Sequence, residues 1–126
     1  MKENYVSFGT AVLLKEKGFD WKCHAMYDKD GHLAPFNFKL VTKAEKREFV
    51  ADAPTLQMAM KWLRDVHKKV INVEYIDFLE HGEVWSYSVL DRNTFHEFTE
   101  KSESFTEHSY EEACEAAIKY CLENLI

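Results

Sequence analysis

The sequence predicts an α+β fold, in which three helices pack on one face of a mainly antiparallel sheet. Three stretches, within residues 7–18, 54–68 and 109–126, have helical caps or an apolar period of 3.6 residues. Two pairs of shorter stretches alternate or are rich in β-branched and aromatic residues, and a turn with glycine joins each pair. This gives the order α-β-β-α-β-β-(β)-α, and helices grouped beside hairpins are typical of the α+β class.

The first helix is predicted to begin after Ser7, which can cap it, and to end at Gly18, which adopts the left-handed conformation at low cost. The alternation over residues 21–27 then predicts a half-buried strand. A tight turn at residues 28–31 leads to a returning strand over residues 36–40, so these segments are expected to form the first hairpin.

The stretch APTLQMAMKWLRDVHKK, residues 53–69, follows a charged surface connection over residues 42–48 and predicts a helix over about residues 54–68. At about 100° per residue, its apolar face gathers the following side chains: Leu56, Ala59, Met60, Leu63, Val66 and His67. The charged side chains lie on the opposite half, and Trp62 lies at its far margin. His67 is therefore predicted to be a structural residue of the core stripe.

The strongest strand signals lie in the second half of the chain. Residues 70–79 and 83–90 are rich in β-branched and aromatic residues and are predicted to form a long hairpin. Residues 92–108 are ambiguous, and their three phenylalanines suggest one more strand with a polar loop. Ser109 and Glu112 form a capping box that begins the last helix. Its inner face is predicted to hold small residues: Ala113, Cys114, Ala117 and Cys121.

Length and composition restrict the class of protein. The 126 residues predict a single domain over residues 1–126, and 46% hydrophobic residues with four Gly and two Pro exclude a disordered chain. No apolar run is long enough for a signal peptide or a spanning helix, so we expect a cytoplasmic protein. The three cysteines form no CxxC, which predicts reduced and mostly buried thiols.

The charge is unevenly distributed, because the net charge of -6 arises in residues 94–126, where eight glutamates oppose two lysines. Lys61, Arg64 and Lys68 lie at spacings i, i+3 and i+7 on a predicted helix, from which they can contact one phosphate backbone. Asp65 interrupts this basic half and the whole chain is acidic, so a solvated face is the favoured interpretation. A nucleic-acid-associated factor that uses these three bases is the alternative.

No motif in the sequence identifies a reaction, and we predict no catalytic, cofactor-binding or metal-binding residues. The motifs GxGxxG, GxxxxGK[ST] and GxSxG are absent, and the six histidines lack the spacing of HExxH or of a zinc finger. The turn at residues 28–31 resembles part of a calcium loop, but Met26 and Asn37 stand where its first and last carboxylates belong. A non-enzymatic protein is therefore favoured, and an enzyme with an unrecognised site stays the minority alternative.

The predicted strands carry more large aromatic side chains than one small core face needs: Trp21, Tyr27, Phe36, Phe38, Tyr75, Phe78, Trp85 and Tyr87. Three helices cannot cover both faces of the sheet, so part of this surface is expected to contact a partner. The favoured function is thus a protein-interaction module, through self-association as a homodimer or through another protein. No membrane partner is expected.

Three stretches carry a resemblance to a known family: VSFGTAVLLKEKGFD, APTLQMAMKWLRDVH and SYEEACEAAIKYCLENLI, at the start, middle and end of the chain. In their amino-acid sequence and in their order along the chain, they resemble a family of small uncharacterised proteins from phage and prophage-like regions of gut anaerobes. The resemblance implies a phage or mobile-element setting. It implies no activity and no catalytic residues.

Two further resemblances concern the topology of the second half. Residues 55–126 have the α-β-β-β-α order of a double-stranded-RNA-binding domain, but Glu111 and Glu112 stand where such domains carry bases. Residues 70–121 resemble the partial-RNase-H-like domain of certain antitoxins, without the Pro-Asp-Leu-Pro-Gly turn that usually precedes the third strand. This likeness implies an antitoxin-like regulatory factor as a further alternative.

Overall fold

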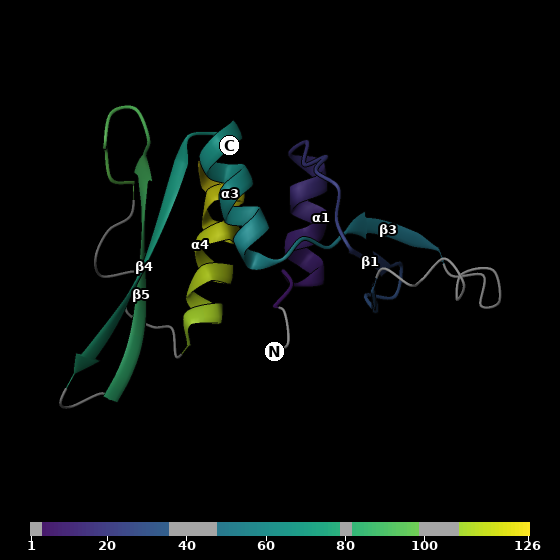
Figure 1. Ribbon diagram of the computed structural model, residues 1–126, viewed down its shortest axis with the longest axis horizontal. Helices are drawn as coiled ribbons and strands as arrows, with labels where there is room; N and C mark the ends of the chain where they lie inside the picture. The colour runs from purple at the N-terminus through teal and green to yellow at the C-terminus, as the bar shows by residue number, and fades with distance from the viewer. Residues whose placement is uncertain (1–3, 36–47, 79–81, 99–108) are drawn as a thin grey trace. The chain divides into compact units, whose positions relative to one another are not determined.

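The computed structural model describes residues 4–35, 48–78, 82–98 and 109–126 (Figure 1). In these residues the chain forms three helices and two antiparallel sheets, which confirms the predicted α+β class and the predicted order of helices and hairpins. The contacts between residues divide the chain into two compact units, Met1–Thr55 and Leu56–Ile126. The single domain over residues 1–126 stays a prediction.

The first unit begins with α1, Phe8–Glu16, whose ends lie where the sequence predicts them. The Ser7 side chain caps the helix and accepts a hydrogen bond from the Thr10 backbone N–H at 3.3 Å. Gly18 has φ +91°, and this left-handed residue turns the chain so that the Phe19 N–H donates to the Leu14 carbonyl at 2.9 Å. Both predicted caps of the first helix are therefore confirmed.

The sheet of the first unit contains β1 (Ala25–Asp28), β2 (Leu33–Pro35) and β3 (Phe49–Asp52) in the order β2-β1-β3. The predicted strand over residues 21–27 is shorter than expected, because it begins only at Ala25. The return begins earlier than predicted, and residues 36–40 and most of the predicted connection over 42–48 lie outside the described residues. Strand β3 was not predicted, because its residues, FVAD, do not alternate between apolar and polar side chains.

The second unit contains α3 (Leu56–Val66), β4 (Lys69–Phe78), β5 (Gly82–Asp91) and α4 (Tyr110–Asn124). Strands β4 and β5 form the predicted long hairpin, in an unbroken antiparallel register from Lys69 opposite Asp91 to Phe78 opposite Gly82. Helices α3 and α4 lie side by side against this hairpin (Figure 1).

The structure describes the start of the last helix and the first part of the ambiguous stretch over residues 92–108. The Ser109 hydroxyl accepts a hydrogen bond from the Glu112 backbone N–H at 3.1 Å, so the predicted cap of α4 is confirmed. The ambiguous extra strand is present only as an isolated bridge between Leu90 and Glu97 in the described part of residues 92–108. Residues 99–108, which contain the rest of that prediction, lie outside the described residues.

The buried face of α3 differs from the predicted one. Trp62, placed at the far margin by the helical projection, is 2% exposed, whereas Val66, placed in the apolar stripe, is 50% exposed. The helix ends at Val66, so His67 lies beyond it and meets the edge of the Trp62 ring with 4.6 Å between ring centroids. The projection gave every apolar residue equal weight, but the large indole sets which side of α3 is buried.

Helix α4 supplies most of the remaining core of the second unit through these buried residues: Ala113, Cys114, Ala117, Ile118, Cys121 and Leu122. The three cysteines are free thiols, and two of them are buried as predicted. Burial raises the pKa of the Cys121 thiol to about 12. Burial, with the nearby Asp52 carboxylate, raises the pKa of Cys23 to about 11. These thiols are therefore protonated at neutral pH, which fits packing rather than nucleophilic roles.

Candidate functional site

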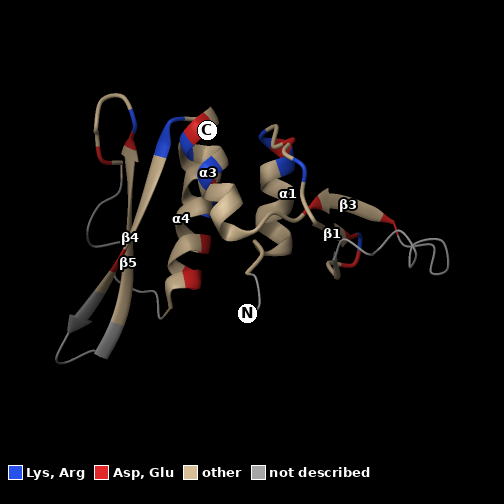
Figure 2. Ribbon diagram, viewed as in Figure 1, with Lys and Arg blue, Asp and Glu red and all other residues tan. Residues whose placement is uncertain are grey.

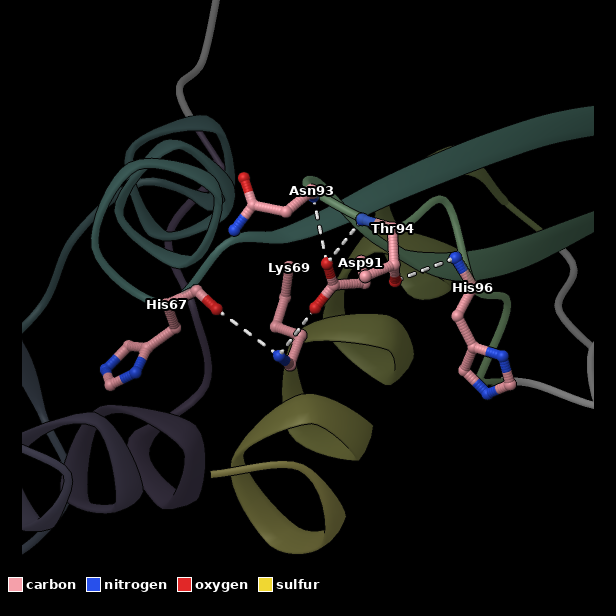
Figure 3. Close-up of polar contacts among 6 residues, drawn as sticks. All are labelled: His67, Lys69, Asp91, Asn93, Thr94 and His96. Atoms are coloured by element: carbon pink, nitrogen blue, oxygen red, sulfur yellow. Dashed lines mark hydrogen bonds and ion pairs between the residues drawn. The ribbon is translucent and has the colours of Figure 1, made fainter.

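The second unit has a polar corner where the hairpin opens, formed by residues 64–69 and 91–96. Helix α3 runs into β4 through His67 and Lys68, and β5 ends opposite the start of β4, so the two segments become neighbours. The Arg92 N–H donates to the Lys68 carbonyl at 2.8 Å and holds them together. We call this surface the corner; Figure 3 shows its central residues.

Asp91 organises the turn that leaves β5. Its Oδ1 atom accepts hydrogen bonds from the backbone N–H groups of Asn93 and Thr94, both at 2.9 Å (Figure 3). The Phe95 N–H donates to the Asp91 carbonyl at 2.8 Å, and the Asp91 N–H donates to the His96 carbonyl at 2.8 Å. The Thr94 and Asn93 N–H groups hold the pKa of Asp91 below its ordinary value of 3.8. A single aspartate thus fixes the path of the whole turn.

Lys69 links this turn to the rest of the corner. Its Nζ atom lies 3.7 Å from Asp91 Oδ2, donates to the His67 carbonyl at 3.3 Å, and lies 5.1 Å from the centroid of the Phe98 ring. Its side chain is 15% exposed. Because the ammonium group has an ion pair, a carbonyl and an aromatic ring as neighbours, Lys69 is a structural cation and not a group directed at a ligand.

Phe95 projects from the turn that Asp91 fixes. It is 78% exposed, and its backbone has φ +61°, in the left-handed region that non-glycine residues seldom adopt. The turn therefore holds a large apolar side chain in solvent on a strained backbone, where glycine would be the ordinary residue. Strain that packing does not compensate is concentrated at sites with a function.

The three candidate bases predicted from the sequence lie at different places. Lys61 and Arg64 are exposed on α3, but Lys68 lies beyond the end of the helix with φ +59°, so the i, i+7 spacing does not hold on one helical face. Lys68 Nζ donates to the Asp65 carbonyl at 2.8 Å. Contact of these three bases with nucleic acid stays a prediction.

Asp65 joins the predicted bases to one that the sequence reasoning missed. Its Oδ1 atom lies 3.6 Å from Arg64 Nε and 3.6 Å from Arg92 Nη1. In Figure 2 the bases gather at this end of α3 and at the start of β4, while acidic residues mark the N-terminal half of α4. The register of the hairpin could have indicated Arg92. Residues 69 and 91 are paired, so one further step of the same pairing places Arg92 opposite Lys68.

The first unit contains a cleft and a separate cluster of acidic and histidine side chains. A cleft of about 340 Å³ lies between α1 and β3, lined by Ala11, Lys15, Phe19, Asp20, Met26, Phe49, Val50, Ala51 and Asp52. The lysine of this cleft, Lys15, already donates from Nζ to the Val50 carbonyl at 2.7 Å.

In the β1–β2 turn, ligand atoms of Asp28, Asp30 and His32 lie within 4.8 Å of one another. Asp28 Oδ1 accepts two backbone N–H groups of this turn, so the cluster reads as turn structure.

Replacing Asp91 with asparagine should flatten the acid limb of the stability curve. The folded pKa of Asp91 lies below its ordinary value of 3.8, so ionised Asp91 stabilises the fold above about pH 4, and this contribution is lost as the pH falls through the folded pKa. Urea titrations from pH 7 to pH 2 measure it. Wild type should lose more stability than Asp91→Asn below pH 4, and two parallel curves would contradict the assignment.

Replacing Phe95 with glycine should stabilise the fold. Glycine removes the left-handed strain of about 1–2 kcal/mol but adds backbone entropy to the unfolded chain, so the net gain should be about 0.5–1 kcal/mol. The side chain is 78% exposed, so little packing is lost. Urea denaturation of Phe95→Gly beside Phe95→Ala separates strain from side-chain loss, because alanine keeps the strain. Equal stabilities of the two variants would show that the backbone there is unstrained.

The sequence was compared with protein-family models, with curated proteins and with solved structures, and none of the three comparisons finds a match. Within the described residues, no helix has the length and apolar character needed to cross a membrane.

Proposed function

We propose that the protein is a non-enzymatic interaction module that binds another protein through the corner, with Phe95 as the central apolar contact. The observation that carries the proposal is the exposure of Phe95 on a turn fixed by Asp91 at a strained φ of +61°. Aromatic residues at the centre of interfaces often contribute most of the binding free energy, and a rigid turn reduces the entropy lost on binding.

The surroundings of Phe95 support a protein partner. Val66, at the end of α3 in the same corner, is 50% exposed, so a second apolar side chain is available. Arg64 and Arg92 share the Asp65 carboxylate, so the corner also carries charged side chains. An apolar centre with a charged rim is the ordinary anatomy of a protein interface.

The proposed setting is the cytoplasm of a cell that carries a phage or mobile element. It rests on the resemblance of VSFGTAVLLKEKGFD, APTLQMAMKWLRDVH and SYEEACEAAIKYCLENLI to proteins of such regions. The setting names no partner, and the experiment below does not depend on it.

The test compares partner capture by two variants. Immobilised wild type, Phe95→Gly and Leu33→Ser are exposed to extract of the source organism, and bound proteins are quantified. Leu33 is a matched control, because it is an exposed apolar residue of the first unit at 40% exposure. A partner should bind Phe95→Gly about 30-fold more weakly than wild type, as for a loss of about 2 kcal/mol at an interface hot spot, and bind Leu33→Ser unchanged. Equal retention by all three proteins would contradict the proposal.

A nucleic-acid-associated or antitoxin-like factor is the second candidate, and the observation in its favour is the position of Arg92. Arg92 and Arg64 both contact the Asp65 carboxylate. Lys61 lies on α3 and Lys68 lies just beyond its end. The exposed ring of Phe95 offers a surface on which a base can stack. Gel shifts with duplex and single-stranded probes at low salt test it. Binding that weakens in Arg64→Ala and Arg92→Ala would favour this candidate over a protein partner, and no shift at low salt would remove it.

A further inference from the structure

Strand β4 lies at the edge of its sheet in the part of the chain that the structure describes. It pairs with β5 over its whole length, and no other described strand pairs with it. The far edge of β5 is already used near its end, because Glu97 bridges Leu90 and the Phe98 N–H donates to the Val89 carbonyl at 2.8 Å. Among the described residues, the outer edge of β4 is therefore unpaired over the whole strand, whereas that of β5 is paired near its end.

The hydrogen bonds at the corner show which backbone groups of β4 point outward. The Asp91 N–H and the Val89 carbonyl both bond away from β4, to His96 and Phe98. In an antiparallel ladder, pairs that exchange hydrogen bonds alternate with pairs that do not. The partners of Asp91 and Val89 in β4 therefore also point outward, and the alternation extends to Val73.

Within the described parts of the chain, these outward groups face no other strand. No described residue hydrogen-bonds to the outward N–H and C=O groups of Ile71 and Val73. Soluble proteins usually protect such an edge with a proline, a bulge or a central lysine, because an open edge recruits further strands. The register of β4 and β5 shows no bulge, the strand contains no proline, and its lysine, Lys69, stands at the end and is held by Asp91.

We propose that β4 pairs with β4 of a second copy of this chain, antiparallel and centred on Val73, to give a four-stranded sheet β5-β4-β4-β5. Val73 of one copy then exchanges two hydrogen bonds with Val73 of the other, using the groups that point outward. The pairing places Asn72 opposite Glu74, both of which are exposed, so an amide faces a carboxylate. Lys69 stands opposite residue 77, an aspartate, at each end.

Charge selects this register over its neighbours. Centring the pair on Glu74 would put two glutamates directly opposite each other, which destabilises a sheet. Centring it on Asn72 would pair fewer residues and would put Lys69 opposite Tyr75 instead of an acid. The register centred on Val73 uses residues 69–77 of both copies and places no two like charges opposite each other.

This inference goes beyond the proposed function, because it places a second copy of the chain at a surface other than the corner. The two ideas fail separately. Loss of the dimer in Phe95→Gly with a dimeric Val73→Pro would place self-association at the corner and remove the β4 pairing. If Phe95→Gly loses partner capture but dimerises as wild type does, that result would support both proposals.

The first test changes one backbone group. Val73→Pro removes the outward N–H, and because this N–H takes no part in the ladder to β5 the hairpin is expected to persist. Sedimentation of the full chain should show a wild-type dimer whose dissociation constant rises about 30-fold or more in Val73→Pro, since both copies lose a hydrogen bond at the axis. Val73→Thr keeps the N–H and the β-branched shape, so it should stay dimeric. A monomeric wild type at 1 mM (about the highest practical concentration), or a dimer unchanged by proline, would overturn the proposal.

The second test reads the register. In a Cys23→Ser background, Asn72→Cys and Glu74→Cys proteins are oxidised separately and as a mixture. Residue 72 of one copy should lie opposite residue 74 of the other in a pair without mutual hydrogen bonds, about 4.5 Å apart at Cα, which a disulfide can span. Identical positions would be about 8 Å apart, too far to bridge. Disulfide dimers should therefore form in the mixture, and dimers that form equally well from Asn72→Cys alone would overturn the register.

Discussion

Replacing Trp62 with alanine is expected to lower the free energy of unfolding by about 3–5 kcal/mol. The indole is 2% exposed, on the face of α3 that packs against α4 and β4. Its edge-on contact with the His67 ring would also be lost. Alanine would leave a large cavity, because the packed surroundings of a buried side chain relax only in part around the missing ring.

Urea denaturation followed by circular dichroism measures this loss, with Lys61→Ala as the control on the exposed face of the same helix. The control should change stability by no more than about 0.5 kcal/mol. Val66→Ala makes the comparison decisive, because the helical projection placed Val66 in the core and Trp62 at the margin. A larger loss for Val66→Ala than for Trp62→Ala would show that the projected face is the buried one.

The sequence predicted the elements with local signals better than it predicted their faces and ends. The caps at Ser7 and Ser109 and the glycine at residue 18 were read correctly, because each acts through hydrogen bonds or backbone freedom within four residues. The end of α3 was missed, since Lys68 takes the left-handed position at φ +59° without being glycine or asparagine. No residue type marks such an end.

The candidate site depended on contacts that a local reading cannot supply. Lys61 and Arg64 were found as exposed bases because they share a helix. Arg92 and Phe95 were missed, because their place beside α3 follows from the register of two ten-residue strands and from the turn that Asp91 fixes. Part of the aromatic surplus is also used internally, since Trp85 meets the edge of the Tyr110 ring of α4 with 5.6 Å between ring centroids.

Replacing Leu14 with alanine is expected to lower the free energy of unfolding by about 2–5 kcal/mol, because its side chain is fully buried in the first unit. The same cost is expected for Leu122→Ala in the second unit, whose side chain is equally buried. The pair tests whether residues 1–126 unfold as one domain, as the length of the chain predicts.

In one cooperative domain, either substitution shifts the whole transition, because unfolding of one unit removes the support of the other. Calorimetry of wild type should then show a single peak, and both Leu14→Ala and Leu122→Ala should move all of it to lower temperature. Two peaks, of which Leu14→Ala moves only one, would show that Met1–Thr55 and Leu56–Ile126 unfold separately. The single-domain prediction would then be wrong, and the interaction surfaces of the second unit could be studied in a chain shortened to Leu56–Ile126.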